Sequence, residues 1–200
     1  MTQSLNLPAL MILDVQKGFD DPYWGKRCNP KAEENMARLQ TEWRKRGGTI
    51  IYSKHLSIQP DSPLHHTKKI GTEFKDIIAP RPGEPVFTKQ VNSAFIGTEL
   101  EIFLTKNQIN SVVITGLSTQ HCVSTTTRMS GNLGYQTYLV SDAIAAFEIT
   151  GHLGKQHSAE TVQELELAML QKEFATIVTT DEILTQVVNV DSADGLITSS

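Results

Sequence analysis

Three side chains that could act together in catalysis stand far apart in this sequence: Asp14, Lys89 and Cys122. A carboxylate can accept a thiol proton and a cation can stabilise a thiolate, so the three groups could form an activated cysteine nucleophile. Cys122 follows the apolar run SVVIT and the polar segment GLSTQ, whereas a structural cysteine would pack inside an apolar run. On these residues alone, a nucleophilic site and a buried cysteine beside an Asp–Lys ion pair are about equally supported.

The place of Cys122 at the start of a predicted helix favours ionisation of its thiol. The free N–H groups and the positive dipole end of a helix N-terminus stabilise a thiolate. Lys89, if it lies nearby, would stabilise it further by charge attraction. We therefore expect the pKa of Cys122 to lie below that of a free cysteine.

Short apolar runs alternate with longer amphipathic stretches along the chain, as in βα units that wind a parallel sheet. Strands are predicted at Ala9–Val15, Thr49–Ser53, Val86–Lys89, Ser111–Thr115, Thr137–Ser141 and Ala175–Val178. Helices are predicted at Pro30–Arg46, Thr98–Lys106, Cys122–Leu133, Ala159–Gln171 and Thr180–Val188. The sequence thus predicts an α/β fold with three layers, α/β/α, around a six-stranded parallel sheet. The segment Leu56–Pro85 contains five prolines and is predicted to be a loop, with a short helix around Glu73–Ile77.

The carboxyl ends of the strands are where an open α/β sheet binds its ligands. Asp14 ends the first predicted strand and Lys89 the third, while Cys122 follows the fourth and Asp142 the fifth. The residues before Asp14, LMIL, suggest a strand that is buried on both faces, where a carboxylate needs a partner. The reactive side chains are therefore expected at one edge of the fold.

Composition narrows the classes of partner. With 200 residues and 39% hydrophobic content, the chain is expected to form one domain, residues 1–190, followed by a loosely ordered tail, residues 191–200. The net charge of −4 argues against nucleic acid and anionic membranes as partners and leaves a small molecule or another protein chain. The N-terminus has neither a signal-peptide pattern nor a membrane span, so the cytoplasm is the expected compartment. Cys28 and Cys122 are far apart and are expected to be free thiols.

Three segments resemble the isochorismatase-like cysteine hydrolase family, which includes nicotinamidases, carbamoylsarcosine amidase-like and ureidoacrylate-hydrolase-like enzymes. They are DVQKGF, VFTKQVNSAFIGTELEIFL and GLSTQHCVSTTTRMSGNLGYQTYLVSDA, and the similarity runs from Ala9 to Leu184. The resemblance implies a catalytic triad of Asp14, Lys89 and Cys122. It further implies a cis peptide bond at Leu117–Ser118, an oxyanion hole formed by the backbone N–H groups of Ser118 and Cys122, and a homo-oligomer, either a dimer or a tetramer.

The activity implied by this resemblance is hydrolysis of a C–N bond in a small amide, carbamoyl or lactam compound through a thioester on Cys122. Isochorismatases that cleave a vinyl ether often lack the cysteine, so its presence favours amide hydrolysis. Vinyl-ether hydrolysis remains an alternative, and insensitivity to a thiol alkylator would favour it. A non-catalytic binding or scaffold protein is the other alternative, and an unreactive Cys122 with an ordinary pKa would favour that.

No metal and no other cofactor is expected. Nicotinamidases of the family bind a metal through an Asp-x-His pair and a further histidine, but here Ser53 stands where the acid should be. The adjacent His65 and His66, on a proline-flanked loop, are expected at a solvated surface. The segment from His55 onward is instead similar to the metal-free cysteine hydrolases, including streptothricin-hydrolase-like members. Activity is therefore expected to survive exhaustive chelation.

Four residues are predicted to contact the substrate: Phe19, His55, Phe95 and Thr119. Phe19, Phe95 and Thr119 lie within the three family-like segments, and His55 lies near the end of the second predicted strand. Trp24 and Phe147 could also form part of a pocket wall or could simply belong to the core. The sequence does not name the substrate.

Overall fold

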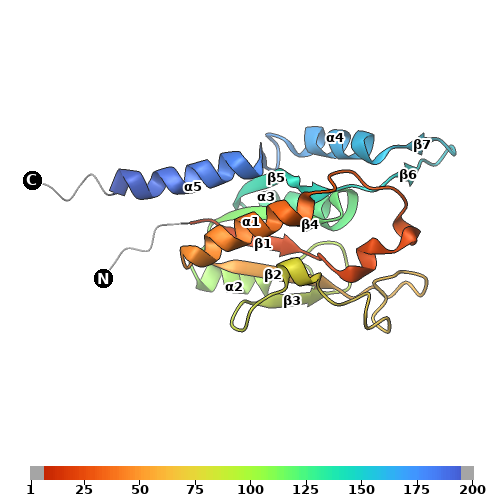
Figure 1. Cartoon of the computed structure of the whole chain (residues 1–200), viewed down its shortest axis with the longest axis horizontal. Coiled ribbons are helices and arrows are strands. Elements are labelled where there is room, and N and C mark those ends of the chain that lie inside the picture. The colour runs from red at the N-terminus through yellow and green to blue at the C-terminus, as the bar shows by residue number, and fades with distance from the viewer. Residues whose placement is uncertain (1–6, 195–200) are drawn as a thin grey trace, which may run out of the picture.

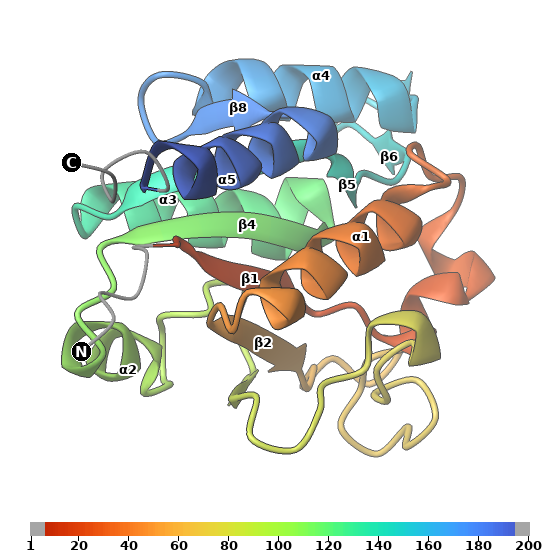
Figure 2. The same ribbon diagram turned by 60° about the vertical axis from the view of Figure 1, so that its left-hand side comes forward.

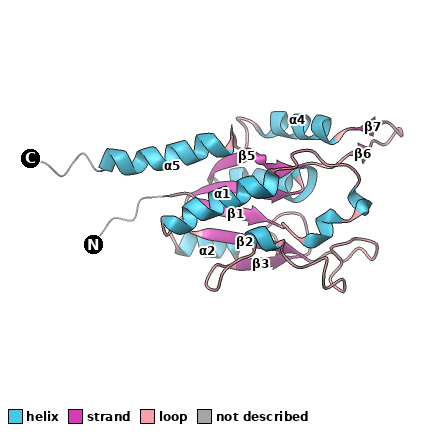
Figure 3. Ribbon diagram, viewed as in Figure 1, coloured by secondary structure: helices cyan, strands magenta, loops and turns pink. Residues whose placement is uncertain are grey.

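Six parallel strands form the central sheet in the order β3-β2-β1-β4-β5-β8. Figure 1 shows β3, β2, β1, β4 and β5 side by side, Figure 2 labels β8, and Figure 3 colours the strands magenta. The computed structural model describes residues 7–194, and their side chains as far as residue 187. The strands are β1 Ala9–Leu13, β2 Ile50–His55, β3 Val86–Lys89, β4 Ser111–Leu117, β5 Gln136–Ala145 and β8 Thr176–Val178. A separate antiparallel pair consists of β6, Ile149–Thr150, and β7, Gln156–His157. The predicted six-stranded parallel sheet is confirmed.

Helices cover both faces of the sheet, which confirms the predicted three-layer α/β/α arrangement (Figure 2). α1, Ala32–Lys45, and α5, Thr180–Asp194, pack together on one face. α2, Leu100–Lys106, and α3, Ser124–Asn132, contribute to the core on the other face. α4, Ala159–Leu170, packs on α3 near the edge of the sheet that carries β8. No helix in the described part of the chain is both long enough and apolar enough to cross a membrane.

The amphipathic pattern of α1 explains how this helix is held on the sheet. Met36, Leu39 and Trp43 recur at helical spacing and are fully buried. The indole N–H of Trp43 donates to the carbonyl of Pro8 at 2.8 Å, just before β1 begins. Gly47, with φ of 65°, follows the helix in a conformation that glycine adopts readily. The chain therefore stops there and turns into β2.

Some boundaries differ from the predicted ones. β1 ends at Leu13 because Asp14 leaves the extended conformation, with φ of 53°. β5 continues to Ala145, since a shift in the β4–β5 register lets its last residues pair with the end of β4. The helix expected around Glu73–Ile77 is a single 3₁₀ turn at Asp76–Ile78. α5 includes the first four residues of the predicted tail, and residues 195–200 lie outside the described part of the chain.

A partly buried ion cluster links the loop after β1 and the long loop after β2 to α1. Glu33, on α1, accepts from Arg27 at 2.7 and 2.8 Å and from Lys75 at 2.8 Å. Burial opposes ionisation of Glu33, but the hydrogen bonds from Arg27 and Lys75 outweigh it and hold its pKa at about 2. The two loops that this cluster links also contribute residues to the lining of the cavity described below.

The low pKa of Glu33 predicts a loss of stability in acid. A carboxyl group with a pKa of about 2 in the folded state and 4.5 unfolded stabilises the fold above pH 4.5, and this contribution disappears as the pH falls to about 2. Its size is about 3 kcal/mol in the free energy of unfolding. Denaturant titrations between pH 2 and 7 should show a shallower pH dependence for Glu33→Gln than for the wild type. Parallel curves for the two proteins would contradict the assignment.

Candidate active site

The sheet brings Asp14, Lys89 and Cys122 together at the carboxyl ends of its strands. Leu13 pairs with Ser53 on one side and with Gly116 on the other, so Asp14 stands between the ends of β2 and β4. This is where the strand order reverses, the usual ligand position in an open α/β sheet. Lys89 lies two strands away, beside His55 in the β2–β3 register, and its long side chain reaches across to Asp14.

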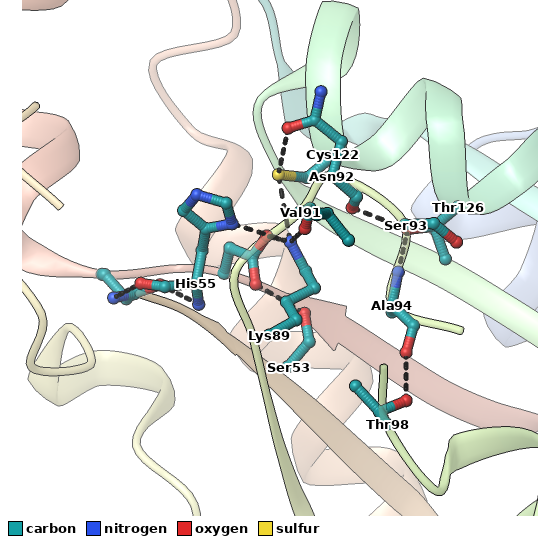
Figure 4. A network of polar contacts seen from close by, with 12 residues as sticks. Ser53, His55, Lys89, Val91, Asn92, Ser93, Ala94, Thr98, Cys122 and Thr126 are labelled. Atoms are coloured by element: carbon teal, nitrogen blue, oxygen red, sulfur yellow. Dashed lines mark hydrogen bonds and ion pairs between the residues drawn. The ribbon is translucent and has the colours of Figure 1, made fainter. Parts of the chain in front are cut away.

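The three groups are buried, and Lys89 contacts both of the others. Figure 4 shows Lys89 beside Cys122 and His55. Lys89 Nζ lies 2.6 Å from Asp14 Oδ2 and 3.2 Å from Cys122 Sγ. Ser53 Oγ donates to Asp14 Oδ1 at 2.6 Å. A carboxylate oxygen of Asp14 lies within 4.8 Å of Cys122 Sγ. Asp14 is therefore held by Ser53 and Lys89 close enough to exchange a proton with the thiol after a small movement.

Lys89 is held as an ammonium group among several acceptors. Burial alone would lower the pKa of Lys89, but Asp14 and Cys122 raise it above its ordinary value. Its Nζ also contacts His55 Nδ1 at 3.2 Å and donates to the carbonyl of Val91 at 3.1 Å. Burial and the nearby Lys89 lower the pKa of His55 below its ordinary value. Because the Lys89 ammonium group can only donate, His55 Nδ1 accepts from it, which places the proton of the neutral imidazole on Nε2.

The prediction of a low pKa for Cys122 is wrong. Burial and the neighbouring Asp14 carboxylate raise the pKa of this thiol above its ordinary value, and the attraction of Lys89 does not offset them. Cys122 also lies in a π-helical turn, Thr119–Val123, rather than at the first residue of α3. As a thiol it accepts from Lys89 and faces Asn92 Oδ1 at 3.8 Å. Attack by this sulfur therefore requires a base at the moment of reaction, and Asp14 is the buried carboxylate beside it.

The backbone between β4 and Cys122 makes an unusual turn. The Leu117–Ser118 peptide bond is cis. Within the described part of the chain, the N–H group of Ser118 donates no hydrogen bond, and the N–H group of Cys122 belongs to the π-helical turn Thr119–Val123. Gly116, with φ of 132°, precedes this turn, and a Cβ there would lie 2.2 Å from the carbonyl oxygen of Leu13. Glycine is thus required for β4 to pass β1 closely and reach the turn.

A cavity of about 270 Å³ opens over the thiol. Aromatic, polar and aliphatic side chains contribute to it, from the end of β2, from the loops that follow β1, β2 and β3, and from the segment after β4. Its lining consists of Phe19, Tyr23, Trp24, His55, Ser57, Gln59, Ser62, Leu64, Asn92, Ser118, His121 and Cys122.

The cavity includes two of the four residues predicted to contact the substrate. Phe19 and His55 line it, but Phe95 and Thr119 do not. Phe95 is buried in the core on the α2 side of the sheet, where its ring stacks on Tyr135 with centroids 5.8 Å apart. Thr119 is fully buried and donates to Gln163 Oε1 at 2.6 Å. The predictions for Phe95 and Thr119 are therefore corrected, because a motif does not specify which way each of its side chains points.

Asn92 is a cavity residue that the sequence interpretation missed. It lies three residues after Lys89 in the segment VFTKQVNSAF, so its position within the second family-like segment was the available signal. Thr126 of α3 accepts from the N–H of Ala94 at 3.0 Å and thereby anchors this loop beside Cys122 (Figure 4). Trp24 lines the cavity, whereas Phe147 packs against the rings of Phe19 and Trp24 and is not among the lining residues.

One group of His, Cys, Asp and Glu side chains in the described part of the chain has the geometry to hold a metal ion: Asp14, His55 and Cys122. The Lys89 ammonium group contacts all three, so a cation already lies among the potential ligand atoms. Ser53, at the position of the missing acid, donates to Asp14. These residues do not fit the metal site of the nicotinamidases, and metal independence stays a prediction.

Comparison with known proteins identifies the family. Residues 8–182 match the isochorismatase domain. The chain belongs to the isochorismatase family of hydrolases. It is 54% identical over 176 residues to the isochorismatase family protein YrdC of Bacillus subtilis, covering 88% of this chain and 94% of that protein.

Two further relatives extend the comparison. A putative hydrolase of the isochorismatase family from Chromobacterium violaceum has a crystal structure that matches with a TM-score of 0.88 at 39% identity, over 94% of this chain and 97% of that one. N-carbamoylsarcosine amidase of Arthrobacter is 28% identical over 158 residues, covering 70% of this chain and 60% of that protein. The resemblance stated from the three sequence segments is thus confirmed.

Proposed function

We propose that this isochorismatase-family hydrolase cleaves the C–N bond of a small amide, carbamoyl or lactam compound, with Cys122 as the nucleophile. The observation that carries the proposal is the contact of one buried ammonium group, Lys89, with both Asp14 and Cys122 beneath a cavity. The relative named as an amidase supports the choice of a C–N bond.

In the first half of the reaction, Cys122 Sγ attacks the carbonyl carbon as Asp14 accepts the thiol proton. The raised pKa of Cys122 fits this order, because the thiol loses its proton during attack rather than before it. The developing oxyanion accepts from the N–H groups of Ser118 and Cys122, and the Ser118 N–H has no other partner in the described part of the chain. Asp14 then returns the proton to the departing nitrogen, and a thioester remains.

In the second half, Asp14 accepts a proton from water, the resulting hydroxide attacks the thioester carbon, and the acid is released with the sulfur protonated again. Lys89 stabilises both the Asp14 carboxylate and the negative charge that passes through the sulfur, since it contacts both. Ser53 keeps the carboxylate oriented through its hydrogen bond to Oδ1.

A panel of small carboxamides, ureas and lactams, with ammonia or amine release as the readout, tests this proposal. We expect release from at least one uncharged carboxamide, and complete loss of it after alkylation of Cys122. Cleavage of a vinyl ether that persists after alkylation, with no amide cleaved, would support the alternative hydrolase. The absence of any turnover together with tight ligand binding would support a binding protein. Function in the cytoplasm and assembly into a dimer or tetramer stay predictions.

Substitution of the two phenylalanines tests the cavity assignment. Phe19→Leu should raise KM for the best amide about 10-fold, equivalent to about 1.4 kcal/mol, because a ring that contacts the substrate is lost. Phe95→Leu is the matched control and should leave KM within about twofold, since small hydrophobic exchanges in a core affect mainly stability. Steady-state kinetics with melting temperatures for both variants provide the comparison. The opposite ranking of the two KM values would contradict the assignment.

A further inference from the structure

Among the residues that the structure describes, the lining of the active-site cavity contains no side chain that carries a full charge at pH 8. Of the described residues that form it, none is Asp, Glu, Lys or Arg. His55 and His121 are its basic groups. His55 accepts from Lys89 at Nδ1, and its protonation would place a second cation beside that ammonium group. Burial of the His121 ring lowers its pKa below the ordinary value, so His121 is neutral at pH 8.

Two cations close to the cavity are already paired. Lys89 is buried, with its Nζ 2.6 Å from Asp14 Oδ2. The guanidinium group of Arg27 lies 6.0 Å from the centre of the Phe147 ring and forms a bidentate ion pair with Glu33. A substrate carboxylate in the cavity would find no free cation among the described lining residues. Burying an unpaired charge costs several kcal/mol, so such a substrate would bind poorly.

One wall of the cavity is a fixed aromatic surface. The rings of Phe19 and Trp24 have centroids 4.9 Å apart, and Phe147 supports both at 5.9 Å. The Trp24 indole N–H donates to the carbonyl of Gly18 at 2.8 Å, which fixes that ring. Neutral polar groups are also available, because Ser118, a lining residue, has a buried hydroxyl group without a hydrogen-bond partner in the described part of the chain.

We propose that this cavity selects uncharged amides with a flat, unsaturated substituent and excludes amides that carry a carboxylate. The proposal rests on the proposed function, since it takes Cys122 as the atom that meets the amide carbon. Phe19 and Trp24 bind the substituent, and Ser118 and Asn92 offer neutral hydrogen-bonding groups to the amide.

Charge selection can be measured without knowing the substrate, with two alkylators of nearly equal shape. Iodoacetamide is neutral and iodoacetate is an anion, and both alkylate a thiol. Rate constants for Cys122 at pH 8 are obtained by peptide mass spectrometry and divided by those for 2-mercaptoethanol. Potassium chloride at 0.5 M screens the repulsion of the anion by the net negative chain. We expect the normalised preference for iodoacetamide to be about 10-fold or more. A ratio near or below one, or no labelling of Cys122 by either reagent, would overturn the proposal.

A charge introduced into the lining provides the matched control. Gln59 is exposed and lines the cavity, so Gln59→Lys adds a cation where the fold tolerates it. This variant should raise the iodoacetate rate relative to iodoacetamide several-fold, whereas the neutral Gln59→Met should not. Equal ratios in both variants would count against the proposal. Because neither measurement needs turnover, a protein that hydrolyses no amide would refute the proposed function and leave the charge preference measurable.

The aromatic wall is tested with iodoacetanilide, which adds a flat ring to the neutral reagent. It should label Cys122 about 10-fold faster than iodoacetamide after the same normalisation, because the ring packs on Phe19 and Trp24. Phe19→Leu should remove most of this gain, and Phe95→Leu should keep it. A gain that is absent in the wild type, or equal in both variants, would overturn this part of the proposal.

Discussion

Replacement of Cys122 by alanine should lower kcat for amide hydrolysis by about 10⁴-fold or more, because removal of a nucleophile leaves only binding and oxyanion stabilisation. The side chain is small and packed beneath the cavity, so the fold should persist. Ammonia release by the purified variant, with its melting temperature, is the measurement.

Cys28→Ala is the control for this variant. Cys28, the other of the two cysteines, is buried against the N–H of Ala146 and against Gln163, and it is not among the lining residues of the cavity. It should retain nearly full activity. Equal activity losses in the two variants would show that the thiol of Cys122 has no special chemical role.

Asp14→Asn should affect both catalysis and stability. Without the carboxylate, no group beside the thiol accepts its proton, and kcat should fall by about 10³-fold or more. Lys89 would remain buried without its counter-ion, so the free energy of unfolding should fall by about 3–5 kcal/mol. Asparagine tolerates the positive φ of Asp14, so the backbone conformation is not the cause of either effect.

A double variant separates these two effects. Asp14→Asn combined with Lys89→Met removes both charges, so most of the lost stability should return in chemical denaturation. Activity should stay lost, since the base is still absent. Restored hydrolysis in the double variant would mean that Asp14 acts only by stabilising the fold, which contradicts its role as a base.

The strand pattern and the three family-like segments were enough to predict the sheet, its flanking helices and which reactive side chains lie together. They were not enough to predict in which direction each side chain points or how deeply it is buried. Phe95 and Thr119 belong to the same segments as the triad, yet their side chains turn toward Tyr135 and Gln163, which only the folded chain brings near.

The pKa of Cys122 shows the same limit. A cysteine that lies near both a helix start and a lysine is predicted to be a thiolate. Burial and the short distance to the Asp14 carboxylate instead favour the thiol, and both depend on how the chain packs. The extension of β5 likewise depends on distant contacts, because the side chain of Asn29 donates to the carbonyls of Ser141 and Ile144 at 2.8 Å each.

The most direct test of Cys122 as the nucleophile is to trap the acyl group during turnover. Hydroxylamine added to the enzyme with its best amide should divert a thioester to the hydroxamate, and rapid acid quenching followed by peptide mass spectrometry should find the acyl mass on Cys122. We expect both, with the adduct absent from Cys122→Ala. Continued amide hydrolysis by Cys122→Ala, or wild-type turnover that yields neither hydroxamate nor an adduct on Cys122, would contradict the account.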